Sequence, residues 1–351
     1  MREYLYRLAT DKEKGFAAAF FGAFLMLLSY FYALAVWAIL LLYRIKIFKT
    51  HTLPVPVISV GNITLGGVGK TPMVQFIARY LKEKGIKPVI LTRGYMGEGV
   101  KAESDEAALL SESLGGIPVV VGANRVKMAR KVLKKYSPDV FILDDGFQHW
   151  RLARNLDIVL VDAARPFGNG WLLPRGILRE PRSSLRRAGM IVLTKTDLAE
   201  KNLAALEEKI KDFNSLCPVI ETVHRPVSLK DFAQNKAVEL SFLKGKTVAA
   251  LSSIGDPVSF EKLLKSCGAA VKKHFAFPDH HVFTEKDLAL AADFCKEERI
   301  DVFIVTEKDA VKLKALLPRS SGVKFLSLPI KIEITEGEDE FFKRISDCVH
   351  S

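Results

Sequence analysis

The stretch Pro54–Thr71, PVPVISVGNITLGGVGKT, constrains the fold more than any other part of the chain. An apolar, β-branched run leads into a glycine-rich loop, and Lys70 and Thr71 follow before a helical pattern begins. A strand, a glycine-rich loop and a helix in this order bind phosphate, because backbone N–H groups and the positive end of the helix face the anion. In such a loop Lys70 would reach the terminal phosphates, and the Thr71 hydroxyl would bind Mg²⁺.

The loop departs from the general pattern G-x-x-x-x-G-K-[ST] at its first position, where Thr64 replaces glycine. Gly69 keeps its place before Lys70, and two further glycines lie inside the loop. An ordinary glycine-rich turn is the alternative, but the complete order of strand, loop, lysine, hydroxyl and helix favours phosphate binding. We therefore expect the nucleotide to bind at Thr64, Gly66, Gly67, Val68, Gly69, Lys70 and Thr71.

An uncharged apolar segment, Gly15–Tyr43, precedes this loop. It exceeds the ~20 residues that a helix needs to span a bilayer. Arg44, Lys46 and Lys49 follow at once, as expected on the cytosolic side of a membrane, where cations also attract anionic headgroups. The segment is predicted to insert into a membrane, either across it or partly within one leaflet. The alternative is a buried hairpin in a soluble core.

The rest of the chain alternates strand and helix patterns, which predicts parallel sheets covered by helices. The fold class is therefore α/β, with a P-loop NTPase-like parallel sheet sandwich, a second, smaller α/β domain and an N-terminal membrane helix. A length of 351 residues allows about two domains. We expect the membrane helix and its flanks at 1–50, the P-loop domain at 51–217, an extended linker at 218–231, the smaller domain at 232–323, and a returning strand with a C-terminal helix at 324–351.

The net charge of +12 indicates an anionic partner, such as a nucleotide, a phosphorylated substrate or a membrane surface. Basic and aromatic residues are not interleaved as in nucleic-acid modules, so no nucleic-acid partner is expected. A long loop at 164–187, rich in Gly, Pro and Arg, is too long for a plain connector. We expect its arginines to contact phosphate or lipid headgroups.

Asp144 and Asp145 follow a buried strand, where a P-loop NTPase places its metal-binding acid. Ligands of parallel sheets bind beyond the carboxyl ends of the strands, so these acids should converge with the glycine-rich loop. Adjacent strand-end residues point to opposite faces, and only one of the two acids is expected to approach Mg²⁺ directly. A strand-end acid that caps a turn with Gly146 is the alternative.

A second polar cluster, His280 and His281 after Asp279, has too few neighbouring ligands for a metal site. A general base, or a histidine that orients one, is the functional interpretation. A solvated polar turn is an equal alternative.

The run Thr194–Asp197, TKTD, resembles the base-reading motif of GTPases, whereas their metal-loop pattern DxxG is missing after Asp144 and Asp145. A membrane-associated P-loop GTPase is therefore kept as the alternative function.

Six segments together make the chain resemble the tetraacyldisaccharide 4′-kinase family, the lipid A kinases of Gram-negative envelopes. They are Ser59–Pro72, Leu91–Tyr95, Ser104–Glu106, Asp144–His149, Phe167–Pro181 and Phe277–His281. The resemblance covers nearly the whole chain, and the family also carries threonine at the position of Thr64.

The resemblance implies ATP- and Mg²⁺-dependent phosphorylation of the 4′-hydroxyl of a tetraacylated glucosamine disaccharide 1-phosphate. It implies an inner-membrane enzyme with two α/β/α domains on the cytoplasmic side and an acylated lipid substrate. Asp105 matches the family's proposed catalytic base, assisted by His280 or His281; which of the two assists stays open, as does the oligomeric state. The acids placed around the metal and phosphates match Asp144, Asp145 and Glu180.

Overall fold

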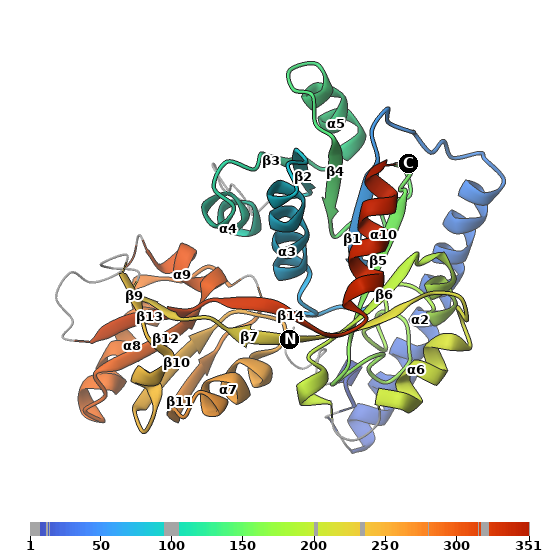
Figure 1. Cartoon of the computed structure of the whole chain (residues 1–351). Coiled ribbons are helices and arrows are strands. Elements are labelled where there is room, and N and C mark those ends of the chain that lie inside the picture. The colour runs from blue at the N-terminus through green and yellow to red at the C-terminus, as the bar shows by residue number, and fades with distance from the viewer. Residues whose placement is uncertain are drawn as a thin grey trace. The chain divides into compact units, whose positions relative to one another are not determined.

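The computed structural model describes residues 8–11, 13, 15–94, 105–199, 203–231, 236–279, 281–314, 316 and 323–350. The chain forms two compact units (Figure 1). Unit 1 comprises Met1–Gly94, Ser113–Val223 and Glu333–Ser351, and unit 2 comprises Tyr95–Glu112 and His224–Ile332.

Unit 1 is built on a sheet that has, in the described part of the chain, eight strands in the order β14-β7-β6-β5-β1-β4-β2-β3. The strands from β7 to β3 are all parallel to their neighbours. Their bounds are β1 (Val57–Asn62), β2 (Pro88–Thr92), β3 (Val119–Val121), β4 (Val140–Asp144), β5 (Leu156–Asp162), β6 (Met190–Thr194), β7 (Val219–Pro226) and β14 (Ile330–Glu336). Since β1, β2, β4 and β6 are buried along their whole length, they form the centre of the core, as strands of a parallel sheet do.

The helices of unit 1 include α3, which packs on β1, β2 and β4 directly after the glycine-rich loop. It ends before Gly85, whose φ of 78° lies in the left-handed region that glycine favours just past a helix. The bounds of the helices are α2 (Phe16–Arg44), α3 (Lys70–Glu83), α5 (Arg125–Leu133), α6 (Leu203–Lys211) and α10 (Glu338–His350), with short 3₁₀ helices at η1 (Arg182–Arg187) and η2 (Thr196–Leu198).

Unit 2 holds a second sheet in the order β11-β10-β12-β13-β8-β9, in which β11 to β13 are parallel and β8 and β9 are antiparallel. Asp256 caps α7 and Pro257 opens it, at a position where the missing N–H of proline is harmless. The strands are β8 (Leu229–Asp231), β9 (Lys236–Val238), β10 (Thr247–Ser252), β11 (Ala270–Ala276), β12 (Val302–Thr306) and β13 (Lys324–Leu328). The helices are α4 (Asp105–Ser113), α7 (Pro257–Ser266), α8 (Glu285–Glu297), α9 (Glu307–Leu313) and the 3₁₀ helix η3 (Leu240–Leu243).

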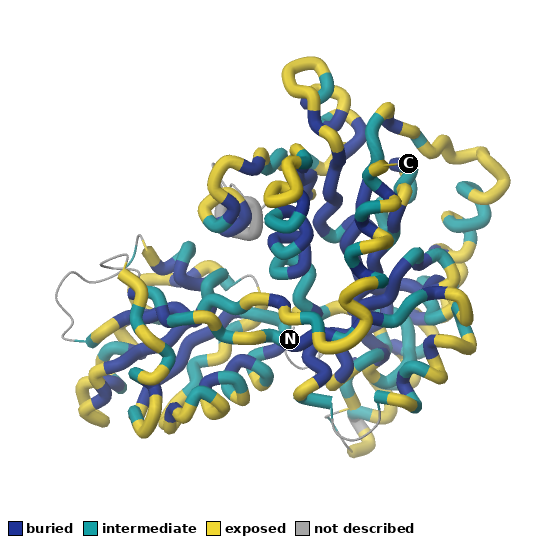
Figure 2. The backbone as a smooth tube through the Cα atoms, viewed as in Figure 1, coloured by how far each residue is buried: buried dark blue, intermediate teal, exposed yellow. Residues whose placement is uncertain are grey.

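Figure 2 shows the inner strands of both sheets largely in the dark blue of buried residues, whereas the edge strands β3, β14, β9 and β11 are mostly exposed or intermediate. The predicted fold class is confirmed, because both units are α/β and their sheets are mainly parallel.

The apolar helix α2 belongs to unit 1 and is mostly exposed. Its segment Ala18–Arg44 is long and apolar enough to cross a membrane. One stripe faces the unit, where Leu25, Ser29 and Val36 are buried. Large apolar side chains at spacings of three and four residues form an exposed stripe along the helix: Phe20, Phe24, Leu27, Phe31 and Leu34.

Candidate active site

The glycine-rich loop between β1 and α3 has the backbone of an anion-binding turn. Gly66 and Gly69 have φ of 117° and 91°, in the left-handed region that glycine adopts without a steric penalty. Gly69 is the N-cap of α3, and no side chain of the described residues caps this helix start. Its first N–H groups and the helix dipole are therefore available to a phosphate, which suits the predicted role of residues 64–71.

The long arginine-rich loop lies directly beside this turn. Leu65 N donates to the Ile177 carbonyl at 2.7 Å, and Arg179 N donates to the Ile63 carbonyl at 2.7 Å. Between these two bonds, Thr64 forms an antiparallel bridge with Leu178. The pairing fixes the start of the phosphate loop and brings the Arg179 side chain to it. The predicted functional importance of this loop therefore has a structural basis.

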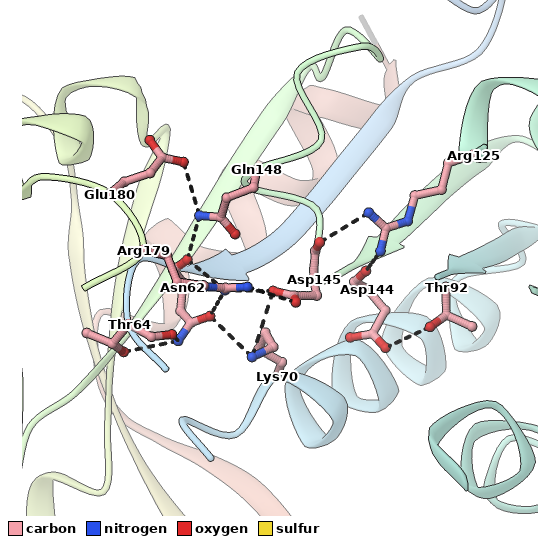
Figure 3. A network of polar contacts seen from close by, with 10 residues as sticks. All are labelled: Asn62, Thr64, Lys70, Thr92, Arg125, Asp144, Asp145, Gln148, Arg179 and Glu180. Atoms are coloured by element: carbon pink, nitrogen blue, oxygen red, sulfur yellow. Dashed lines mark hydrogen bonds and ion pairs between the residues drawn. The ribbon is translucent and has the colours of Figure 1, made fainter. Parts of the chain in front are cut away.

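Asp144 and Asp145, at the end of β4, point to different surroundings (Figure 3). Asp144 is buried, and Thr92 Oγ1 donates to its Oδ2 at 3.3 Å. Asp145 adopts a left-handed backbone with φ of 50°, which is uncommon for a residue other than glycine. This conformation turns its carboxylate toward Lys70, whose Nζ lies 3.8 Å from Asp145 Oδ1.

Arg179 and Asn62 complete a charged network around Lys70 (Figure 3). Arg179 binds both carboxylate oxygens of Asp145, at 3.0 and 2.8 Å. It also donates to the Asn62 carbonyl at 3.0 Å, and Lys70 Nζ donates to Asn62 Oδ1 at 3.2 Å. The Asn62 side-chain amide nitrogen in turn donates a hydrogen bond to the Thr64 carbonyl at 2.7 Å. The network thus places two cations and one carboxylate at the mouth of the phosphate loop.

The electrostatics keep Asp145 ionised. Burial alone would raise the pKa of this carboxyl group, but Lys70, the hydrogen-bonded Arg179 and Arg125 together hold the pKa well below its usual range. Arg125 is buried and donates to the Asp144 carbonyl at 2.6 Å and to the Asp145 carbonyl at 3.2 Å. Burial lowers the pKa of Arg125. An ionised, partly exposed carboxylate beside two cations suits the binding of a metal and phosphates.

Glu180 stands behind the network and is fully buried. Gln148 Nε2 donates to Glu180 Oε1 at 3.1 Å and to the Asn62 carbonyl at 2.9 Å. Arg187 donates to Glu180 Oε2 at 2.8 Å. Both carboxylate oxygens of Glu180 therefore bind side chains in this structure, and Gln148 links them to the phosphate loop.

The predicted metal residues come from three parts of the chain: the start of α3, the end of β4 and the long loop that holds Glu180. Thr71 is the second residue of α3 and Asp144 the last residue of β4. Within the described residues, no three or more His, Cys, Asp or Glu side chains form a group that could hold a metal. A Mg²⁺ ion in phosphoryl-transfer enzymes needs few protein ligands, because substrate phosphates and water supply the rest. The hydroxyl and the acids present fit that mode of binding.

The TKTD run, Thr194–Asp197, contacts the phosphate loop and stabilises its backbone. Thr194 Oγ1 donates to the Val68 carbonyl at 2.9 Å. Lys195 is buried and forms an ion pair with Asp162 at 2.6 Å. These contacts join the ends of β5 and β6 to the loop, and they leave Lys195 turned into the protein.

The predicted base Asp105 and the histidine His281 belong to unit 2. Asp105 is the first residue of α4, and its side chain is outside the described part, as is the whole of His280. His281 Nε2 lies 3.1 Å from Asp287 Oδ2, and its ring stacks on Phe277 with centroids 4.5 Å apart. The proposed roles of these residues therefore stay predictions.

Sequence reasoning assigned no role to Asn62, Arg125 or Gln148. Asn62 could have been noticed as a polar residue that ends an apolar strand just before the phosphate loop. Gln148 lies within the DDGFQH segment, and Arg125 opens α5 a few residues after β3. Their contacts depend on pairs far apart in sequence, which local patterns do not reveal.

His149 should make the free energy of unfolding depend on pH. Burial, followed by repulsion from Arg125 and Arg154, lowers the pKa of His149 from 6.5 to about 4. Since the unfolded chain binds the extra proton between these two values, stability should rise with pH across that window and fall as pH drops through it. After allowance for solvent screening, the loss should be about 2 kcal/mol. Urea unfolding at pH 4 and pH 7 measures it, and His149→Gln should remove this part of the dependence; an unchanged dependence in the variant would contradict the assignment.

Comparisons with known proteins match one family over nearly the whole chain. A family model described as tetraacyldisaccharide-1-P 4′-kinase matches residues 21–350. A tetraacyldisaccharide 4′-kinase of Syntrophus aciditrophicus is 36% identical over 356 residues, covering 95% of each chain. The corresponding protein of Halothermothrix orenii is 32% identical over 367 residues, again covering 95% of each. The crystal structure of LpxK from Aquifex aeolicus in complex with ATP is similar with a TM-score of 0.72 and 32% identity, covering 94% of this chain and 99% of that one.

Proposed function

The chain belongs to the tetraacyldisaccharide-1-P 4′-kinase family, and from this premise we propose how its residues transfer the γ-phosphate of ATP to the 4′-hydroxyl of a tetraacylated disaccharide 1-phosphate. The observation that carries the proposal is the network of Lys70, Asp145 and Arg179 at the start of α3. Together with the family match and the ATP complex of the related structure, this favours the kinase over the GTPase alternative.

The phosphates of ATP are held by the loop backbone and by the two cations of the network. The N–H groups at Gly69–Thr71 bind negative charge without needing to reorganise. Lys70 and Arg179 stabilise the charge that spreads over the transferred phosphoryl group. Because Arg179 already binds Asp145 through both of its terminal nitrogens, its guanidinium is fixed in orientation before the nucleotide arrives.

We propose Thr71, Asp144 and Asp145 as the residues that would hold Mg²⁺, with Glu180 supporting the site through Gln148. When bound, the ion would neutralise charge on the phosphates. We propose Asp145 for the closer approach, since its side chain is partly exposed whereas Asp144 is buried.

Asp105 is proposed as the base that takes the proton of the 4′-hydroxyl. A histidine of the DHH segment, His280 or His281, would assist it. Asp105 is the first residue of α4, a position at which the helix dipole favours a negative charge.

We propose further that α2 lies along the membrane surface and does not span the bilayer. Ser29 Oγ donates to the Leu172 carbonyl, and Tyr32 OH donates to the Arg179 carbonyl at 3.0 Å. Both bonds come from the middle of α2. A spanning helix could keep them only if the polar loop around Leu172 and Arg179 entered the hydrocarbon, where unpaired backbone groups cost several kcal/mol. The exposed apolar stripe would instead dip into one leaflet. The ATP site would then face the cytoplasm at the inner membrane.

Tags at both ends of the chain test this placement. In intact cells stripped of their outer envelope, an N-terminal and a C-terminal tag should both be protected from added protease. An N-terminal tag that is cleaved while the C-terminal tag is protected would show that α2 spans the membrane.

A triple change on the exposed stripe, Phe20→Ser, Phe24→Ser and Phe31→Ser, should release most of the protein from membranes. The matched control changes three exposed apolar residues elsewhere, Leu216→Ser, Val258→Ser and Leu290→Ser, and should leave the membrane fraction unchanged. Equal release by both variants would argue against a role for the stripe.

A nucleotide assay tests the proposed chemistry. With Mg²⁺ and the disaccharide lipid in detergent, ATP should support phosphate transfer to lipid, and chelation of the metal should abolish it. GTP hydrolysis without a phosphorylated lipid would favour the GTPase alternative.

A further inference from the structure

A pocket of about 410 Å³ lies on unit 1 outside the network around Lys70. Its lining is cationic, and we call it the α5 pocket. Four of its basic residues come from α5 and the residue after it, and two, His51 and Arg151, come from the chain segments beside that helix. These six residues are His51, Lys127, Arg130, Lys131, Lys134 and Arg151.

The charge of the α5 pocket is uncompensated within the described residues. No Asp or Glu lines it, and none of the described carboxylates forms an ion pair with Lys127, Arg130 or Lys131. Lys127 and Lys131 are four residues apart, as are Arg130 and Lys134, so like charges face each other along the helix. Such pairs destabilise a helix, and an anion bound in the pocket would relieve their repulsion.

The α5 pocket is tied to the end of the apolar helix α2. The rings of Tyr43, in the last turn of α2, and Trp150 meet edge-on at 5.8 Å. Thr50 Oγ1 donates to the Trp150 carbonyl at 3.1 Å, and His51 N donates to the Arg151 carbonyl at 2.8 Å. His51 and Arg151, which line the pocket, are therefore linked to the segment that follows α2. A Tyr–Trp pair is typical of the level of the headgroups in a membrane.

The pocket is separate from the proposed ATP site. Arg125 opens α5 and points its guanidinium to the carbonyls of Asp144 and Asp145. Lys127, Arg130 and Lys134 are exposed residues of the same helical segment, and they line the pocket with Arg151. The same helix therefore contributes one arginine to the candidate active site and further cations to the α5 pocket.

We propose that the α5 pocket binds the phosphate of anionic phospholipid headgroups of the bilayer, and thereby orients the kinase on the membrane. The proposal rests on the membrane association proposed for α2, and it adds a second, electrostatic contact to the apolar one. Cations at this level of a membrane attract anionic headgroups, and the attraction falls with salt.

Flotation of the full-length protein with lipid vesicles tests the proposal. Vesicles of neutral phosphatidylcholine alone report the apolar contact of α2. Vesicles that also contain phosphatidylglycerol report the pocket. At low salt, the wild-type protein should partition at least about tenfold more strongly onto the anionic vesicles.

The quadruple variant Lys127→Gln, Arg130→Gln, Lys131→Gln and Lys134→Gln should lose most of this preference while still binding neutral vesicles. The control removes the same charge from exposed positions on α6 and α7, as Lys209→Gln, Lys211→Gln, Lys262→Gln and Lys265→Gln, and should keep the preference. Because the first variant relieves repulsion along α5, its Tm should not fall.

Three results would overturn the proposal. The first is an equal loss of the anionic preference in both variants, which would reflect net charge alone. The second is an unchanged preference in the α5 variant. The third is a fall in kcat/KM of the α5 variant in neutral detergent micelles without phospholipid, which would show that the pocket binds the kinase substrate itself. Loss of binding to neutral vesicles by the wild-type protein would instead contradict the proposed insertion of α2.

Discussion

Lys70→Ala should lower kcat/KM for lipid phosphorylation by about 10³-fold or more, because it removes the cation proposed to stabilise the transferred phosphate. Lys70 Nζ lies 3.2 Å from Asn62 and 3.8 Å from Asp145, at the first residue of α3. Within the described residues no other lysine forms an ion pair with Asp145, so Arg179 would remain as the side chain paired with this carboxylate. The loss should be larger in kcat than in the Kd for ATP, since the loop backbone still binds the phosphates.

The matched control for this variant is Lys82→Ala, at the other end of α3, where the lysine donates to the Gly115 carbonyl. Its activity should stay within about twofold of the wild type, since a surface hydrogen bond contributes little. The Tm of Lys70→Ala should remain close to that of the wild type, because a partly exposed ion pair adds about 1 kcal/mol at most. An active Lys70→Ala enzyme would contradict the proposed role of the network.

Asp105→Asn should abolish most turnover, by about 10³-fold, while leaving the Kd for ATP nearly unchanged. The amide cannot take the proton of the attacking hydroxyl, but it keeps the size of the side chain. Steady-state kinetics and nucleotide titration measure the two effects separately.

Glu112→Gln is the control for the same helix, because the ion pairs of Glu112 with described residues are long and lie at the surface, at 3.9 Å to Lys230 and 3.5 Å to Lys314. It should retain full activity. If Asp105→Asn weakens ATP binding as strongly as it reduces turnover, Asp105 has a role in nucleotide or metal binding and is not the base.

Local sequence patterns were sufficient to predict the strand, loop and helix of the phosphate site. The apolar run of β1 and the helical pattern of α3 each depend on residues close in sequence, and the glycines between them need a left-handed backbone that few other residues adopt. The convergence of Asp145 on this loop also follows, since parallel strands end at one edge of the sheet.

The positions of Arg179 and Glu180 required the structure. Arg179 reaches Asp145 because Thr64 pairs with Leu178, more than a hundred residues away in the chain. Glu180 stays a predicted acid around the metal, and its bonds from Gln148 and Arg187 are contacts that the sequence did not indicate. Pairing between distant loops depends on tertiary packing, which no local pattern encodes.

For α2 too, the sequence predicted part of the answer and tertiary contacts supplied the rest. Length and apolarity predicted insertion into a membrane but left a spanning helix and a helix in one leaflet open. The bonds of Ser29 and Tyr32 to the arginine-rich loop favour the second.

The most direct test of the account is the identity of the lipid product. Purified enzyme, ATP, Mg²⁺ and the tetraacylated disaccharide 1-phosphate should yield a lipid that is one phosphate heavier, with phosphorus NMR placing the new monoester on the 4′-oxygen. Consumption of ATP without a phosphorylated lipid, or a new phosphate on the existing 1-phosphate, would contradict it.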